Sequence, residues 1–181
     1  IRDSHGISLD EGKALWYKNR FVKTRVYKGE AGDDPMAFMG DLTMGTANTH
    51  VVRHAGKILA LEEGHFPYEL TPELETVGYW DFDGKLKTSM TAHPKICPET
   101  GEMMFFSYFN FEAPYLNYHR VNAEGELVQS EGIDIPNIVM MHDFNITRNH
   151  TIFMDLPLAF SLEATVSYTH LRAHETRHDL V

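Results

Sequence analysis

The stretch HAGKILALEE at residues 54–63 joins a tight turn to a hydrophobic strand, and this unit recurs along the chain. ETGEMMFFSY at 99–108 and TRNHTIFMDL at 147–156 have the same form, and the turn positions lie 45 and 48 residues apart. A repeat of about 40–50 residues with roughly four strands in each unit is typical of the blades of a β-propeller. The alternative is an ordinary β-sandwich, whose strands follow one another at similar intervals. The repeat favours the propeller.

Turns that contain glycine predict the hairpins of this fold. Gly56, Gly84 and Gly125 each separate two hydrophobic runs, and glycine readily takes the positive φ that a tight hairpin turn needs. The separation of 41 residues between Gly84 and Gly125 indicates that a second hairpin recurs as well. No long stretch with helical periodicity interrupts this pattern. We therefore predict an all-β fold with about two to three propeller blades, which is too few to close a ring, so we expect a fragment of a longer protein.

Composition and charge exclude several classes of partner. The 181 residues carry a formal net charge of −10 and no run of Lys or Arg longer than a pair, which argues against binding to nucleic acid. No apolar run approaches the roughly 18 residues of a membrane span. The single cysteine, Cys97, excludes an internal disulfide and favours a reducing compartment, cytoplasmic or plastid-like, although the sequence does not specify which.

Two histidines occupy similar positions in successive repeats. His93, in TAHPK, and His142, in MHDF, each follow a hairpin and open the first strand of the next unit. Because the inner strands of neighbouring blades lie side by side, both side chains are expected to point into one channel. Converging imidazole nitrogens suit Fe, Zn, Cu or Ni, and the lack of a nearby cysteine disfavours a structural zinc site. The alternative is that both histidines are ordinary surface or hydrogen-bonded residues.

A pair of glutamates adds a candidate partner for these histidines. Glu62 and Glu63 alternate between the two faces at the end of a predicted strand, so one of them is expected to point toward the channel. A metal-bound histidine usually donates its other ring N–H to a carboxylate or carbonyl, which fixes the orientation and tautomer of the ring. The alternative is a solvated strand end.

Several motifs together resemble the carotenoid cleavage oxygenases. They are WYKNRFVKT, GTANTHVVRHAGKILALEE, YELTPELETVGYWDFDGKL, TAHPKICPETGEM and MHDFNIT with FMDLPL, in order between about residues 10 and 163. The resemblance implies a seven-bladed β-propeller that holds Fe(2+) on its axis through four histidines. His93 matches the first of these ligands and His142 the second, and the third and fourth lie outside this chain. Glu63 matches a glutamate that braces the second ligand from outside the coordination sphere.

The resemblance also implies the reaction. Members of the family cleave a conjugated C=C bond with O2 to give two carbonyl products, on an apolar polyene that reaches the iron through an apolar tunnel, with possible access from a membrane surface in the full-length protein. Members that cleave stilbenes often carry a lysine where this chain has Glu62, which favours a carotenoid or apocarotenoid here. The alternatives are a stilbene-cleaving member, a member that binds or isomerises a polyene without cleaving it, and a propeller interaction module without iron. The fragment alone, with two of the four ligands, is expected to be inactive.

The resemblance also predicts the geometry of the site. The ring nitrogens of His93 and His142 are expected to lie about 3–5 Å apart, as two ligands of one metal would. Glu63 is expected at the far nitrogen of His142, with no carboxylate partner for His93.

The last residues break the family pattern. We expect residues 1–164 to form the carotenoid oxygenase fragment and residues 165–181 to be a non-family tail. VSYTHLRAHET is similar to translated sequencing-adapter read-through, so we interpret the tail as a sequence artefact. His170, His174 and His178 have a spacing that would suit a metal site on a helix, but we expect them to lie far from the site of His93 and His142.

Overall fold

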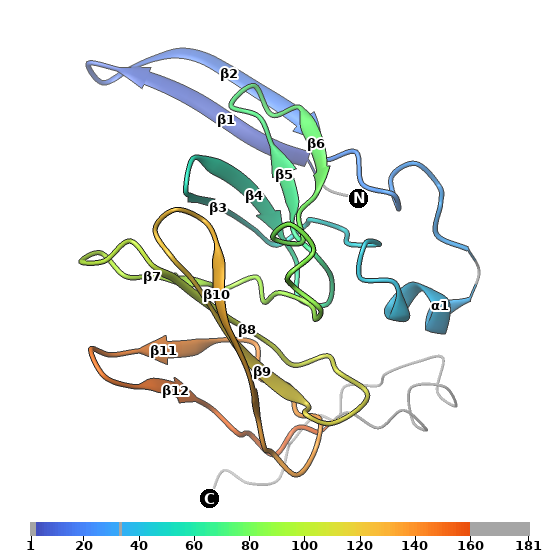
Figure 1. Ribbon diagram of the computed structural model, residues 1–181. Coiled ribbons are helices and arrows are strands. Elements are labelled where there is room, and N and C mark those ends of the chain that lie inside the picture. The colour runs from blue at the N-terminus through green and yellow to red at the C-terminus, as the bar shows by residue number, and fades with distance from the viewer. Residues whose placement is uncertain (1–2, 33, 160–181) are drawn as a thin grey trace, which may run out of the picture.

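A computed structural model describes residues 3–32 and 34–159 (Figure 1). The described residues form an all-β fold with one short helix, α1 (Pro35–Gly40). Among these residues, no helix has the length and apolar character needed to cross a bilayer. The strands are β1 (Asp3–Asp10), β2 (Lys13–Phe21), β3 (His50–His54), β4 (Lys57–Leu61), β5 (Tyr68–Leu70), β6 (Thr76–Tyr79), β7 (Lys95–Ile96), β8 (Met103–Ser107), β9 (Leu116–Val121), β10 (Leu127–Ile133), β11 (Phe144–Ile146) and β12 (Thr151–Phe153).

The strands form two four-stranded antiparallel sheets and two hairpins. The first sheet has the order β3-β4-β5-β6 and the second sheet the order β10-β9-β8-β7. β1–β2 and β11–β12 form two-stranded sheets, and in Figure 1 the four groups follow one another from β1–β2 at the top to β11–β12 at the bottom. Four consecutive strands that pair in chain order are the arrangement expected of a propeller blade.

The hairpins at Gly56 and Gly125 are confirmed. His54 pairs with Lys57 across the first turn, where Gly56 has a φ of +81°. Gly125, with a φ of +92°, lies in the turn between β9 and β10. The predicted repeat of a turn and a hydrophobic strand is confirmed too, because β4, β8 and β12 each follow the first strand of their group.

The prediction of a hairpin around Gly84 is wrong. Gly84 follows β6, the edge strand of the first sheet, and no strand forms after it until β7. Leu86 and Met90, 1% and 0% exposed, are buried in the core between the two sheets instead of pairing with β6. Met90 donates a backbone hydrogen bond to His65 of the first sheet's β4–β5 connection, and Thr91 donates one to a residue of β8. The segment is therefore the connection between two sheets.

Gly84 and Gly125 are consequently not equivalent positions. The turn of the first sheet that corresponds to Gly125 joins β5 to β6, where Thr71 N–H donates to the carbonyl of Glu75. Leu74 supplies the positive φ of that turn, at 65°. Because this turn contains no glycine, the sequence pattern did not indicate it.

Strand β8 is the centre of the hydrophobic core. Met103 and Phe105 pack against residues of the first sheet, whereas Met104 and Phe106 belong to a second cluster with residues that flank and form β11. Successive strand residues point to opposite faces, so a strand covered on both faces is a continuous hydrophobic run. The second sheet is therefore packed between its two neighbours, and the loops that precede β7 and β11 are held close together.

The proposed boundary at residue 164 and the tail histidines lie outside the described residues.

Candidate metal centre

The predicted residues Glu63, His93 and His142 come from three successive groups of strands. Glu63 lies two residues after β4, His93 two residues before β7 and His142 two residues before β11. Leu61, at the end of β4, pairs with His50 at the start of β3. Glu63 therefore lies at the end of its sheet where the first strand begins, and the two histidines occupy the corresponding ends of the following groups.

The three side chains meet at one point. Their metal-binding atoms all lie within 4.8 Å of one another. Glu63 Oε1 is 3.3 Å from His142 Nδ1 and 3.4 Å from His93 Nε2. The two rings contact edge to face, with centroids 4.5 Å apart and an interplanar angle of 61°. The structure thus brings together the two histidines that the repeat selected and the glutamate that the family resemblance selected.

One expectation about this geometry is wrong. Glu63 approaches His142 as expected, but the same oxygen also faces His93, which was expected to have no carboxylate partner. The cause is that the hydroxyl of Tyr108 donates to the other oxygen, Glu63 Oε2, at 3.0 Å. Oε1 is left to face both rings.

The local backbone of His142 is unusual. Its φ is 40°, a left-handed conformation that few residues other than glycine adopt. The turn is braced by Asp143, whose Oδ1 accepts hydrogen bonds from Phe144 N–H at 2.8 Å and from Lys95 Nζ at 2.7 Å. Thr91 Oγ1 donates to the carbonyl of His142 at 3.4 Å. Contacts from the second sheet therefore hold a strained histidine, and strain of this kind clusters at functional sites.

Burial sets the charges of the cluster. It raises the pKa of Glu63, and the hydrogen bond from Tyr108 and the charge of His142 oppose this effect. Burial also lowers the pKa of His93, and a charge on His142 lowers it further. The pKa of Tyr108 is raised by burial and by the nearby Glu63 carboxylate, so the phenol keeps its proton and remains a donor. His93 is therefore neutral near pH 7, which is the form that binds a metal.

The cluster fits a metal ion. Glu63 Oε1 and His93 Nε2 are buried atoms that have no hydrogen-bond partner among the described residues. Most buried polar atoms in proteins have a partner, so such an exception needs an explanation. Two imidazoles that converge on one point suit a transition metal, and a carboxylate beside them can orient their rings.

His50 also lies near the cluster and was missed by the sequence analysis. It begins β3, much as His93 and His142 precede β7 and β11. Its Nδ1–H donates to the carbonyl of Ala92 at 2.7 Å, and its ring stacks on that of His93 with centroids 6.2 Å apart. Its spacing of 43 residues from His93 matches the repeat, so the sequence contained the signal.

Glu62 points away from the cluster. It accepts a hydrogen bond of 2.5 Å from His65 Nδ1, and His65 Nε2 donates to a backbone carbonyl at 3.2 Å. Burial lowers the pKa of His65, but the hydrogen bond and charge of Glu62 outweigh it, so the pKa is raised overall. This pair lines a cavity of about 170 Å³, whose other walls are Met39, Gly64, Phe109 and Phe111.

The chain is similar to known proteins along most of its length. The family model described as retinal pigment epithelial membrane protein matches residues 4–179 of the chain. The chain belongs to the carotenoid cleavage oxygenase family. Carotenoid 9,10(9',10')-cleavage dioxygenase 1 of Pisum sativum is 40% identical over a region that covers 86% of this chain and 34% of that protein. Isoeugenol monooxygenase of Pseudomonas nitroreducens is 41% identical over 76% of this chain and 29% of its own length.

Solved structures of the carotenoid cleavage oxygenase family share the fold. The lignostilbene dioxygenase of Pseudomonas brassicacearum matches with a TM-score of 0.76 and 30% identity over 91% of this chain and 37% of its own. Cobalt-substituted apocarotenoid oxygenase from Synechocystis matches with a TM-score of 0.59 and 26% identity over 76% of this chain and 34% of its own. The chain spans about a third of the length of the curated relatives it matches.

Proposed function

We propose that this chain is part of a non-haem Fe(II) dioxygenase that cleaves a conjugated C=C bond of a carotenoid or apocarotenoid with O2 and gives two carbonyl products. The observation that carries the proposal is the convergence of Glu63, His93 and His142 within 4.8 Å. The 40% identity to a carotenoid-cleaving dioxygenase supports the reaction. The whole protein is proposed to be a seven-bladed β-propeller, in which the first and second sheets are two blades.

His93 and His142 would hold the iron, and two further histidines, expected from the family resemblance, lie outside this chain. The neutral state of His93 supports its role because a metal binds the unprotonated nitrogen of an imidazole. Glu63 Oε1 lies 3.3 Å from His142 Nδ1, where it would accept an N–H from that nitrogen and leave Nε2 of the ring free for the metal. When it is bound, Fe(II) supplies the centre at which O2 is activated beside the double bond.

The surroundings of the site support an apolar polyene as substrate. Glu62 and Gly64, the two neighbours of Glu63 in the chain, line the cavity of about 170 Å³ together with Met39 and aromatic side chains. The methionine and aromatic side chains offer an apolar surface, which favours contact with an apolar ligand. Glu62, which is paired with His65, stands where stilbene-cleaving members of the family often carry a lysine, and this favours a carotenoid or apocarotenoid. A polyene dissolved in a lipid bilayer would reach the whole protein from the membrane surface.

Cleavage of a stilbene or a related phenylpropenoid is the second candidate. It is favoured by the match to the lignostilbene dioxygenase, with its TM-score of 0.76, and by the 41% identity to isoeugenol monooxygenase. Two further alternatives are a member that isomerises a polyene without O2 and an interaction module without iron.

Oxygen uptake separates these candidates. A complete protein that contains this segment, reconstituted anaerobically with Fe(II), is expected to consume O2 with β-carotene or an apocarotenal and to release carbonyl products. His93→Ala is expected to lose both iron and O2 uptake, whereas His150→Ala, at an exposed position beside β12, keeps both. Uptake by His93→Ala at the wild-type rate contradicts the iron site.

Products from a stilbene alone support the second candidate, and polyene isomerisation without uptake supports a non-cleaving member. The absence of both iron and uptake in the wild type supports the interaction module.

A further inference from the structure

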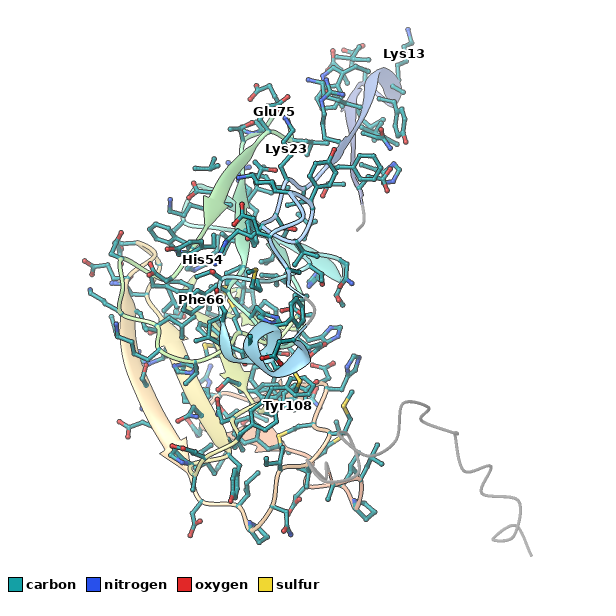
Figure 2. The ribbon with its side chains drawn as sticks, turned by 90° about the vertical axis from the view of Figure 1, so that its right-hand side faces the viewer. Lys13, Lys23, His54, Phe66, Glu75 and Tyr108 are labelled. Carbon is teal, nitrogen blue, oxygen red and sulfur yellow. The ribbon has the colours of Figure 1, made fainter. Side chains whose placement is uncertain are left out.

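Tyr108 connects the three groups of strands that form the metal centre. It lies one residue after β8, in the second sheet, and it is 1% exposed. Its hydroxyl donates to Glu63 Oε2 of the first sheet at 3.0 Å and lies 3.8 Å from Met140 Sδ, in the loop that leads to His142. Figure 2 labels Tyr108 just below α1, on the lower part of the molecule. One hydroxyl thus contacts both neighbours of its own sheet.

The position of this hydroxyl is fixed by packing. The ring of Tyr108 contacts those of Phe106 and Phe109, with centroids 5.6 Å and 4.4 Å apart. A buried side chain that is packed on both sides keeps one rotamer, so its hydroxyl oxygen stays in one place. The polar tip of a buried tyrosine usually has a hydrogen-bond partner, and here that partner is Glu63.

The hydrogen bond determines what the carboxylate presents to the histidines. Because Tyr108 occupies Oε2 of Glu63, the remaining oxygen, Oε1, faces His142 Nδ1 at 3.3 Å and His93 Nε2 at 3.4 Å. The backbone N–H of Ala92 is a second donor to this carboxylate, but no other described side chain donates to Oε2, so loss of the hydroxyl loosens the last torsion of Glu63, which is broad. The N–H of His142 would then lose a fixed acceptor.

We infer that Tyr108 is a positioning residue of the metal centre: it fixes the Glu63 carboxylate, and through it the ring and tautomer of His142. The inference rests on the proposed iron site. It assigns a role to a residue that lies just after β8 of the second sheet and outside the group of Glu63, His93 and His142. Outer partners of metal ligands contribute about 10–100-fold to metal affinity, and Tyr108 is one contact further out than Glu63.

The test compares two tyrosines of one core cluster. Tyr108→Phe removes the hydroxyl that binds Glu63 and keeps the ring. Tyr118→Phe is the control, because Tyr118 packs in the same cluster and its hydroxyl bonds to no residue that the structure describes. Co²⁺ is the probe, and its dissociation constant is measured by competition with a chelator in the complete protein. Tyr108→Phe is expected to weaken Co²⁺ binding about 10-fold and Tyr118→Phe less than about twofold.

A double-mutant cycle separates positioning from a general loss of structure. If Tyr108 acts through Glu63, then Tyr108→Phe changes Co²⁺ affinity less than about twofold in a Glu63→Ala background, where the acceptor of its hydroxyl is gone. Co²⁺ affinity equal to wild type in Tyr108→Phe, or an equal loss in both backgrounds, overturns the inference.

A readout without metal tests Tyr108 on its own. In the metal-free protein, the ¹⁵N shifts of His142 are expected to report an Nδ1–H tautomer that becomes mixed in Tyr108→Phe. An unchanged tautomer in the variant overturns the inference. If the wild type shows no Co²⁺ binding that depends on His93 and His142, the proposed function fails, while the tautomer still decides the role of Tyr108.

Discussion

Glu62 and Glu63 are neighbours in the chain, yet each meets histidine in a different setting. Glu62 and His65 form a closed pair, because one ring nitrogen donates to the carboxylate at 2.5 Å and the other to a backbone carbonyl at 3.2 Å. Glu63, His93 and His142 form an open cluster. Glu63 Oε1 and His93 Nε2 lie 3.4 Å apart, and neither makes a hydrogen bond to any described residue.

The difference shows which histidine–carboxylate group can bind a ligand. In the closed pair both ring nitrogens of His65 lie within hydrogen-bond distance of acceptors, and the pKa of the ring is raised, so neither nitrogen is free for a metal. In the open cluster burial lowers the pKa of His93, and its Nε2 keeps a lone pair beside a carboxylate oxygen. Residue types alone do not distinguish the two groups. They differ in how many ring nitrogens and carboxylate oxygens have a hydrogen-bond partner.

The largest effect expected from this comparison is loss of the metal. His142→Ala removes a ligand from the open cluster, so the iron content of the complete protein after reconstitution is expected to fall to background, and cleavage with it. His65→Ala removes the partner of Glu62 and is expected to leave iron bound. Elemental analysis of the two purified variants measures this. Equal iron contents in the two variants would show that the open cluster is not the site.

Changing the two glutamates tests the same contrast with smaller substitutions. Glu63→Gln keeps a partner for His142 but removes the negative charge, and is expected to weaken Co²⁺ binding about 10–100-fold. Glu62→Gln, one residue earlier, is expected to change this affinity less than about twofold, because Glu62 faces His65. Chelator competition measures both variants. A larger loss in Glu62→Gln than in Glu63→Gln would reverse the assignment of the pair.

The closed pair is expected to matter for stability instead. The side chains of His65 and Glu62 are only 7% and 13% exposed, and removing one partner of a buried ion pair costs about 3–5 kcal/mol. His65→Ala is therefore expected to lower the free energy of unfolding of the complete protein by about 3 kcal/mol. His150→Ala, at an exposed position, is the control, with an expected change within about 0.5 kcal/mol. Denaturant titration measures both, and an equal, small change in the two variants would mean that the pair contributes little.

The pH dependence of that stability gives the smallest effect. The pKa of His65 is raised above its ordinary value of 6.5, so the folded state binds the proton more tightly than the unfolded state. The contribution of the pair is therefore full below pH 6.5 and is lost as the pH rises through the raised pKa. The difference in unfolding free energy between wild type and His65→Ala is expected to shrink as the pH rises above 6.5. A constant difference between neutral and alkaline pH would contradict the ion pair.

His119 is expected to respond to pH with the opposite sign. Burial lowers its pKa to about 4, so its neutral form is the stable one in the fold. Its contribution is present above pH 6.5 and is lost as the pH falls toward about 4. In the His65→Ala variant the opposing contribution of His65 is absent. The free energy of unfolding of this variant, measured by denaturant titration, is therefore expected to decrease as the pH falls from 6.5 toward about 4.

Local patterns predicted the parts of the fold that depend on local geometry. The turns at Gly56 and Gly125 follow from the φ that glycine permits, and the positions of His93 and His142 follow from the repeat. The strand predicted after Gly84 does not form because burial of Leu86 between two sheets outweighs pairing with an edge strand. The sequence of one segment does not predict this outcome, because the outcome depends on contacts with other segments.

The parts of the site that depend on tertiary contacts could not be derived. Alternation along the strand left Glu62 and Glu63 as equal candidates, and the family resemblance, not the pattern, selected Glu63. The role of Tyr108 depends on a hydrogen bond to a residue 45 positions earlier, in another sheet. His65 is a similar case, because its second partner, the carbonyl of Phe38, lies outside its own sheet.

The burial of β8 on both faces has a consequence for synthesis on the ribosome. The face with Phe105 packs against β4, which has already been made when β8 emerges. The face with Met104 and Phe106 packs against residues around Phe144, which follow about 40 residues later. At 5–20 residues per second, that face stays uncovered for about 2–8 seconds. For that interval a nascent chain exposes a strip of methionine and phenylalanine, which is a surface that chaperones bind.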